Sequence, residues 1–128
     1  MNVLIESFYP KIGQGLFDAL PEFTEAWLNF DSIEDVWGYE AFYLDTNANI
    51  RYQNEGLEIC VELLRGMRQA FIDSGLEPFT ESFFYMTQAG KFAIDFSYDD
   101  ISDFGLAGER RNVWIKKTFG ENAKIQWE

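Results

Sequence analysis

The hydrophobic pattern of the chain changes its period within residues 55–98, and this change limits the possible folds more than any other feature. Across residues 55–74 the apolar side chains recur at steps of three and four, the spacing that gathers side chains on one face of an α-helix. The stripe consists of Leu57, Cys60, Val61, Leu64, Met67 and Phe71. Gly75 and Pro78 follow at positions where helices end. The sequence therefore predicts one amphipathic helix here.

Residues 80–98 follow a period of two instead. The apolar positions of the second half are Phe92, Ile94, Phe96 and Tyr98, and they alternate with polar or small residues. This alternation predicts two paired strands, 80–88 and 91–98, around a turn at Ala89 and Gly90. One apolar and one mixed face is typical of a sheet covered on one side only.

The other elements are predicted from weaker patterns. A first helix is expected over residues 3–20, although Pro10, Gly13 and Gly15 disfavour it, and Pro21 ends it. The remaining predictions are strands at 23–30 and 36–44 with a loop at 31–35 between them, a short third strand at 50–52, and a last helix at 108–119.

Together these elements predict one α+β domain over residues 1–128, in the order α-β-β-(β)-α-β-β-α. We expect an antiparallel sheet of about four to five strands with helices packed on one face. Residues 83–86 and 42–44 carry apolar side chains on both faces of their strands. Either helices cover both faces, or some aromatic side chains stay exposed as binding anchors.

Charge narrows the classes of partner. The net charge is −12, and residues 1–64 hold 12 acidic but only two basic residues. A general nucleic-acid binder needs a basic surface, and an anionic membrane repels an acidic one, so neither is expected as a partner. No run of like charges forms a tail, which favours an acidic face on a folded domain.

Several kinds of chemistry are excluded by composition. The chain has no histidine and one cysteine, which removes histidine-based catalysis, histidine-ligated zinc and an internal disulfide. Cys60 lies on the apolar stripe and is expected to be buried and unreactive. Neither a secretory signal nor a membrane-spanning segment is visible, so we expect a cytoplasmic protein.

The densest acidic cluster comprises Asp95, Asp99, Asp100 and Asp103. Carboxylates can hold Mg²⁺ or Ca²⁺, and a carboxylate-metal hydrolase is one alternative function. The spacing matches no EF-hand loop, however, and aspartates are common where strands turn and helices begin. We therefore predict no metal, no cofactor and no metal-dependent catalysis at this cluster.

Three segments resemble a known family. They are Phe71-Ile72-Asp73-Ser74-Gly75-Leu76-Glu77-Pro78-Phe79-Thr80, Gly90-Lys91-Phe92-Ala93-Ile94-Asp95-Phe96-Ser97-Tyr98-Asp99-Asp100 and Glu109-Arg110-Arg111-Asn112-Val113-Trp114. Each is similar to a motif of the YezG-type immunity (antitoxin) proteins of bacterial polymorphic-toxin systems. The chain departs from the family in Phe79, where tryptophan is more usual, and in the glycine-rich loop 104–108.

The resemblance implies a protein that binds and neutralises a cognate nuclease toxin domain without catalysis. Because a nuclease needs a cationic cleft, an acidic inhibitor would be steered toward it. The residues expected to contact the partner are the acids Asp31, Glu34, Asp35, Glu40 and Asp45, the aromatic anchors Trp37, Tyr39 and Tyr43, and a second acidic patch of Asp99, Asp100 and Asp103. An acidic adaptor or chaperone-like module remains the alternative, and the sequence predicts no oligomeric state.

Overall fold

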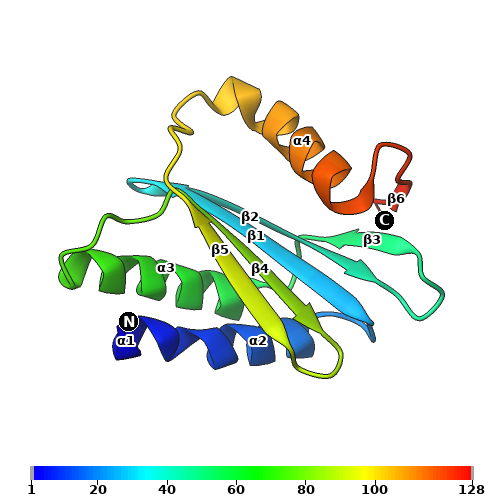
Figure 1. Ribbon diagram of the computed structural model, residues 1–128, viewed down its shortest axis with the longest axis horizontal. Coiled ribbons are helices and arrows are strands. Elements are labelled where there is room, and N and C mark those ends of the chain that lie inside the picture. The colour runs from blue at the N-terminus through cyan, green and yellow to red at the C-terminus, as the bar shows by residue number, and fades with distance from the viewer. Residues whose placement is uncertain (1, 128) are drawn as a thin grey trace.

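Six strands form one mixed sheet with helices on both of its faces (Figure 1). The computed structural model describes residues 2–127. The strands are β1 (Glu25–Ile33), β2 (Val36–Leu44), β3 (Ile50–Gln53), β4 (Glu81–Thr87), β5 (Phe92–Ser97) and β6 (Ile125–Gln126), and their order in the sheet is β5-β4-β1-β2-β3-β6. The expected strands are all present, but β6 adds one to the predicted number. It pairs with β3 in parallel, so the sheet is not antiparallel throughout.

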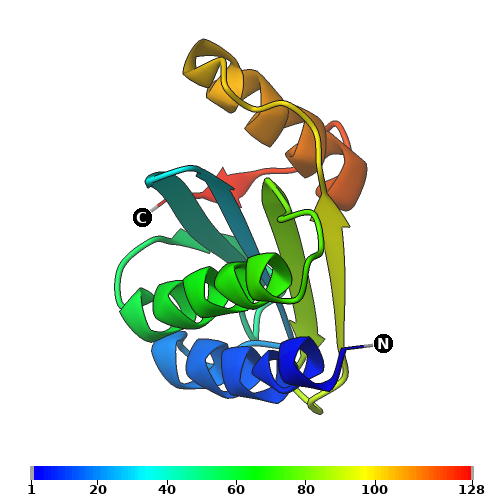
Figure 2. The same ribbon diagram turned by 90° about the vertical axis from the view of Figure 1, so that its left-hand side faces the viewer.

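The helices α1 (Val3–Glu6), α2 (Phe8–Ala19) and α3 (Glu58–Asp73) cover one face of the sheet (Figure 2). The first predicted helix is interrupted at Ser7. This break places Pro10 in the first turn of α2, where a backbone N–H has no intrahelical acceptor and its absence costs little.

The end of α3 follows the glycine signal in the sequence. Gly75 has a φ of 75°, which disfavours side chains with a Cβ. Its N–H donates to the carbonyl of Ile72 at 3.0 Å, and the N–H of Leu76 donates to that of Phe71 at 2.9 Å. These two bonds are the Schellman pattern that satisfies the last carbonyls of a helix.

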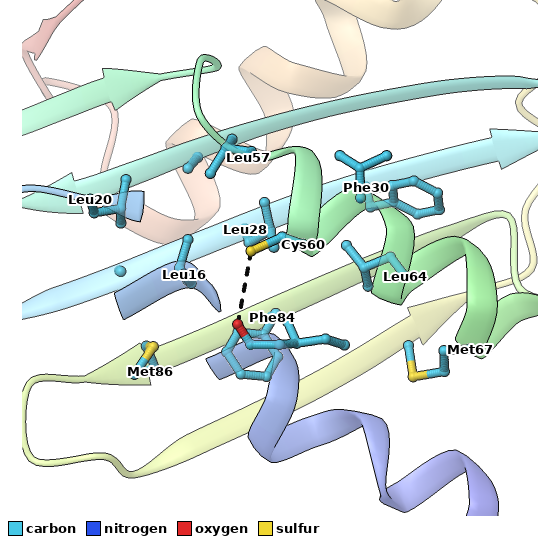
Figure 3. Close-up of a cluster of buried hydrophobic side chains, with 14 of the residues drawn as sticks. Leu16, Leu20, Leu28, Phe30, Leu57, Cys60, Leu64, Met67, Phe84 and Met86 are labelled. Atoms are coloured by element: carbon cyan, nitrogen blue, oxygen red, sulfur yellow. Dashed lines mark hydrogen bonds between the residues drawn. The ribbon is translucent and has the colours of Figure 1, made fainter. Parts of the chain in front are cut away.

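The main core lies between this helical layer and the sheet (Figure 3). Leu28, Leu64 and Phe84 are almost wholly buried there, since alternate strand residues and the α3 stripe point toward one another. Cys60 is buried as predicted, and its thiol donates to the carbonyl of Ile12 at 3.9 Å. Burial raises the pKa of the Cys60 thiol to about 11, so this group stays protonated at neutral pH.

The hairpin between β1 and β2 is tighter than predicted. The loop expected at 31–35 shrinks to Glu34 and Asp35, because β1 continues to Ile33. Pairing on both sides stabilises this extension: Asp31 lies opposite Gly38 of β2 and opposite Glu81 of β4. Glu34 takes a φ of 50° to close the turn.

The last helix, α4 (Ala107–Phe119), lies on the opposite face of the sheet, after a short helical turn η1 (Phe104–Leu106) (Figures 1 and 2). The expectation of helices on one face is therefore wrong. The helix is attached through an aromatic cluster in which Trp114 lies 5.1 Å from Phe42, and Phe119 lies 4.7 Å from Trp27, between ring centroids. Trp127, after β6, lies 5.9 Å from Phe42. Helices thus cover both faces, the first of the two alternatives left open above.

Within residues 2–127, no helix is both long and apolar enough to cross a membrane.

Candidate partner-binding site

Two acidic patches that are far apart in the sequence meet at one end of the sheet. Strand pairing places Asp31, Glu81 and Ser97 in one row across β1, β4 and β5. The β1–β2 turn and the segment that leaves β5 lie beyond this row, at the same end of the sheet (Figure 1). We call the acids gathered here the acidic end; they are Asp31, Glu34, Asp35, Glu81, Asp99, Asp100 and Asp103.

Among these acids, Glu81 has a pKa above its ordinary value. Desolvation by burial raises its pKa, and the charges of Asp31 and Asp99 raise it further. A hydrogen bond from Ser97 and the charge of Arg110 act in the opposite direction without cancelling the effect. Ionisation of this carboxyl is therefore costly in the folded protein, chiefly because of burial, and the neighbouring acids add to that cost.

The aspartates after β5 also shape their own loop. Asp100 accepts a hydrogen bond from the N–H of Ser102 at 2.9 Å, and Asp103 accepts one from the N–H of Gly105 at 3.0 Å. Hydrogen bonding by the Ser102 side chain, followed by that of its N–H, lowers the pKa of Asp100. All three aspartates of this patch are exposed. In the described chain, no three acidic or cysteine side chains lie close enough together to hold a metal ion.

Two of the expected steering acids lie outside the acidic end, and each is paired within the molecule. Glu40 receives hydrogen bonds from the guanidinium of Arg111, two of them from Nε at 3.0 and 3.1 Å. Asp45, in the loop after β2, pairs with Arg51 at 2.9 Å. The hydrogen bond from Arg51, followed by one from the N–H of Asn49, lowers the pKa of Asp45. Their charges are largely balanced inside the molecule.

The three expected anchors differ in exposure although they share one face of β2. Trp37 is 38% exposed, and the guanidinium carbon of Arg65 lies 3.8 Å from the centroid of its ring. Tyr39 is half-buried against the core, and Tyr43 is buried within it. The helical layer covers Tyr43 fully and Tyr39 in part, and Arg65 of α3 contacts the ring of Trp37. Of the three, Trp37 is the ring most accessible to a partner.

Two clefts separate α4 from the sheet. The first, of about 440 Å³, is lined by Asp31, Glu40 and Arg111; the second, of about 880 Å³, is lined by Asp95 and Asp99. Glu81, Phe83, Arg110 and Trp114 line both clefts. The helix therefore rests on its aromatic cluster and leaves open space beside it. The side-chain oxygen of Asn29 is buried at this face without a hydrogen-bond partner in the described chain.

Sequence reasoning did not identify Glu81 or Arg110 as members of the site. Glu81 begins β4 as one acid among 22, and only the strand register shows that it faces Asp31. A signal did exist for the arginines: Arg110 and Arg111 are adjacent near the start of a helix in an acidic chain. Arg110 donates to the carbonyl of Asp103 at 3.2 Å and so joins the helix to the acidic loop.

Comparison with protein-family models identifies a related family. Residues 45–127 match a family model described as Immunity protein YezG-like, and this segment is more than half of the chain. It runs from the loop after β2 to the end of β6 and includes α3, the β4–β5 hairpin and α4. A search of curated proteins finds no match.

Proposed function

Since the chain belongs to the YezG-like immunity protein family, we propose that it neutralises a cognate nuclease toxin domain by stoichiometric binding through the acidic end. Membership of the family implies an immunity or antitoxin role, a toxin protein as partner and inhibition without catalysis. The nuclease class of the toxin, the surface used and action in the cytoplasm are the parts that we add.

The convergence of the two acidic patches is the observation that carries this proposal. In residues 2–127, the carboxylates of Glu34, Asp35 and Asp99 have no hydrogen bond or ion pair, so their charge is directed to solvent. A nuclease gathers basic side chains around its phosphate-binding cleft. Opposite charges on two surfaces steer them together and raise association rates by about 10–1000-fold.

Trp37 is the proposed apolar anchor beside these charges. It follows the β1–β2 turn and lies opposite Ser32, so its ring is close in the chain to Glu34 and Asp35. Tryptophan and arginine are enriched among the residues that dominate binding energy at interfaces. The stacked Arg65 restrains the ring before a partner arrives, which lowers the entropy lost on binding.

Co-expression with the toxin domain encoded beside this chain tests the function. We expect restored growth and one stable complex on a sizing column. Toxicity that persists without any complex would refute the immunity role for that pair.

A charge-reversal variant then tests the surface. Replacing Glu34, Asp35 and Asp99 together by lysine is expected to slow association by at least about tenfold at low salt, and by less at high salt. The control replaces Glu58 and Glu62, which are exposed acids on α3, by lysine as well. It should leave the association rate unchanged. If the first variant keeps the parent's affinity and salt dependence, the acidic end is not the binding surface.

A further inference from the structure

Strand β5 is a free edge of the sheet. It is the first strand in the order β5-β4-β1-β2-β3-β6, and within residues 2–127 it pairs only with β4 (Figures 1 and 2). The opposite edge is β6, which has only two residues. An edge of six residues, as in β5, presents a row of main-chain groups that another strand can join.

The hydrogen-bond pattern identifies which groups are free. The N–H of Thr87 donates to the carbonyl of Lys91 at 2.8 Å, and these two residues are directly opposed. Bonded and outward-facing residues alternate in an antiparallel pair. Ala93 and Asp95 therefore direct their main-chain groups to β4, whereas Phe92, Ile94 and Phe96 direct theirs outward. No hydrogen bond in residues 2–127 reaches the outward groups.

The usual protections of an edge are weak in β5. The strand has no proline, and its one charged side chain is Asp95. Its apolar side chains are not fully covered either, since Phe92 is 45% exposed and Tyr98, just beyond the strand, is also 45% exposed. An apolar edge of this kind can accept a further strand.

We propose that β5 is extended by a strand of the toxin domain, in which apolar residues alternate with lysine or arginine. This inference rests on the proposed function and specifies how the partner is held. Main-chain hydrogen bonds supply affinity in such strand addition, and alternate side chains supply specificity.

The two faces of the sheet at β5 differ in chemistry, and this difference explains why apolar and basic residues would alternate in the added strand. On the side of α2 and α3, an added strand would place its side chains beside Phe92, Ile94 and Phe96, which are apolar. On the side of α4, its side chains would lie beside Asp95 and enter the cleft of about 880 Å³. The acids that line this cleft, Asp95, Glu81, Asp99 and Glu109, outnumber its bases, Arg110 and Lys117. Lysine or arginine on that side of the added strand would offset the negative charge of these acids.

A second copy of this chain is a poor occupant of the same edge. A symmetric antiparallel pair through the middle of β5 would bring the two Asp95 carboxylates opposite each other or within about two positions on one face. Like charges placed so destabilise strand pairing. Each copy also carries a net charge of −12.

Residue-resolved amide exchange tests the proposal directly. In the free protein, the amides of Phe92, Ile94 and Phe96 should exchange quickly, and those of Ala93 and Asp95 slowly. In the complex with the toxin domain, the first three should slow by at least about tenfold. A stable complex in which they still exchange quickly would overturn strand addition and leave the immunity role intact. Failure to form any complex would overturn both.

Two variants provide an independent reading. Ile94→Pro removes an outward N–H and spares the bonds to β4, a position where edge strands tolerate proline. We expect it to weaken toxin binding by at least about tenfold, whereas Ile94→Val should bind as the parent does. Asp95→Lys changes an exposed side chain without affecting the ladder, so it gives a result even if the proline variant unfolds. It should weaken binding more than the α3 control Glu62→Lys. Equal binding by Asp95→Lys and its control would contradict the expected basic partner strand. A dimer that forms as the protein concentration rises, with slow exchange of the amides of Phe92, Ile94 and Phe96, would assign the edge to a second copy.

Discussion

The two faces of the sheet are built in different ways. The face toward α2 and α3 is closed by wholly buried side chains such as Leu28, Leu64 and Phe84. The face toward α4 is covered by one helix that rests on an aromatic cluster, with clefts of about 440 and 880 Å³ beside it. The first face has the dense packing that gives a chain one structure. The second keeps polar and charged side chains near open space, as binding surfaces do.

The largest effect is expected on the dense face. Phe84 is 1% exposed, and Phe84→Ala should lower the free energy of unfolding by about 3–5 kcal/mol because it leaves a cavity that the packed core cannot fill. Urea denaturation measures this loss. A cost below about 1 kcal/mol would mean that this face adapts as easily as the other, and the comparison would fail.

A smaller loss is expected for the aromatic cluster under α4. Trp114 is only half-buried and borders both clefts, so water can occupy part of the space that Trp114→Ala leaves. We expect a loss of about 2 kcal/mol, at the low end for large-to-small changes. The same urea experiment applies, with Val113→Ala as the control, because Val113 is 66% exposed. A loss as large as that of Phe84→Ala would show that α4 is as tightly built into the core as α3.

The ion pair on the α4 face should contribute less still. Glu40→Gln keeps the size of the side chain and removes the charge that faces Arg111, whose pKa the pair raises. We expect a loss of about 1 kcal/mol that shrinks in high salt. A double-mutant cycle with Arg111→Met isolates the interaction. Additive effects of the two changes would show that the pair does not stabilise α4.

The smallest expected effect on stability is that of Glu81→Gln, which should stabilise the protein rather than destabilise it. In the folded protein the pKa of Glu81 lies above its ordinary value of 4.5, so ionisation of this carboxyl is harder in the folded than in the unfolded chain. The resulting penalty is present above the folded pKa and absent below pH 4.5. Glu81→Gln should therefore melt at a slightly higher temperature than the parent at pH 7, and at the same temperature below pH 4.5.

The same variant separates stability from function. If Glu81 belongs to the binding surface, Glu81→Gln should bind the toxin domain more weakly although it is more stable. A variant that is less stable at pH 7 would show that the hydrogen bond with Ser97 outweighs the cost of burying the charge. Calorimetric melting between pH 4 and pH 7 and a binding titration provide the two readings.

The dense face was largely predictable from the sequence. Its elements have long patterns of a single period, namely the stripe of α3 and the alternation of β5, and Gly75 marks the end of α3. The side of the sheet on which α4 lies has no local signal, because it depends on how the chain crosses over after β5. The two residues of β6 are too few to show any period.

The acidic end was predictable only in pieces. The sequence indicates the two patches, but their meeting depends on strand register, which sets Asp31 beside Glu81. Exposure along β2 was not predictable either. Trp37, Tyr39 and Tyr43 lie on the same face of β2, and their different exposure depends on how α2 and α3 pack against that face.

The aromatic cluster also gives the molecule an optical label. Trp27, Trp114 and Trp127 all lie in the layer between α4 and the sheet, and the fourth tryptophan, Trp37, stacks with Arg65 outside the buried core. The intrinsic fluorescence of the protein therefore arises mainly from the looser face. A change in tryptophan emission on mixing with a partner would report displacement of α4 or contact at Trp37. Within residues 2–127, the core between the sheet and the helices α2 and α3 contains no tryptophan and would not contribute to that change.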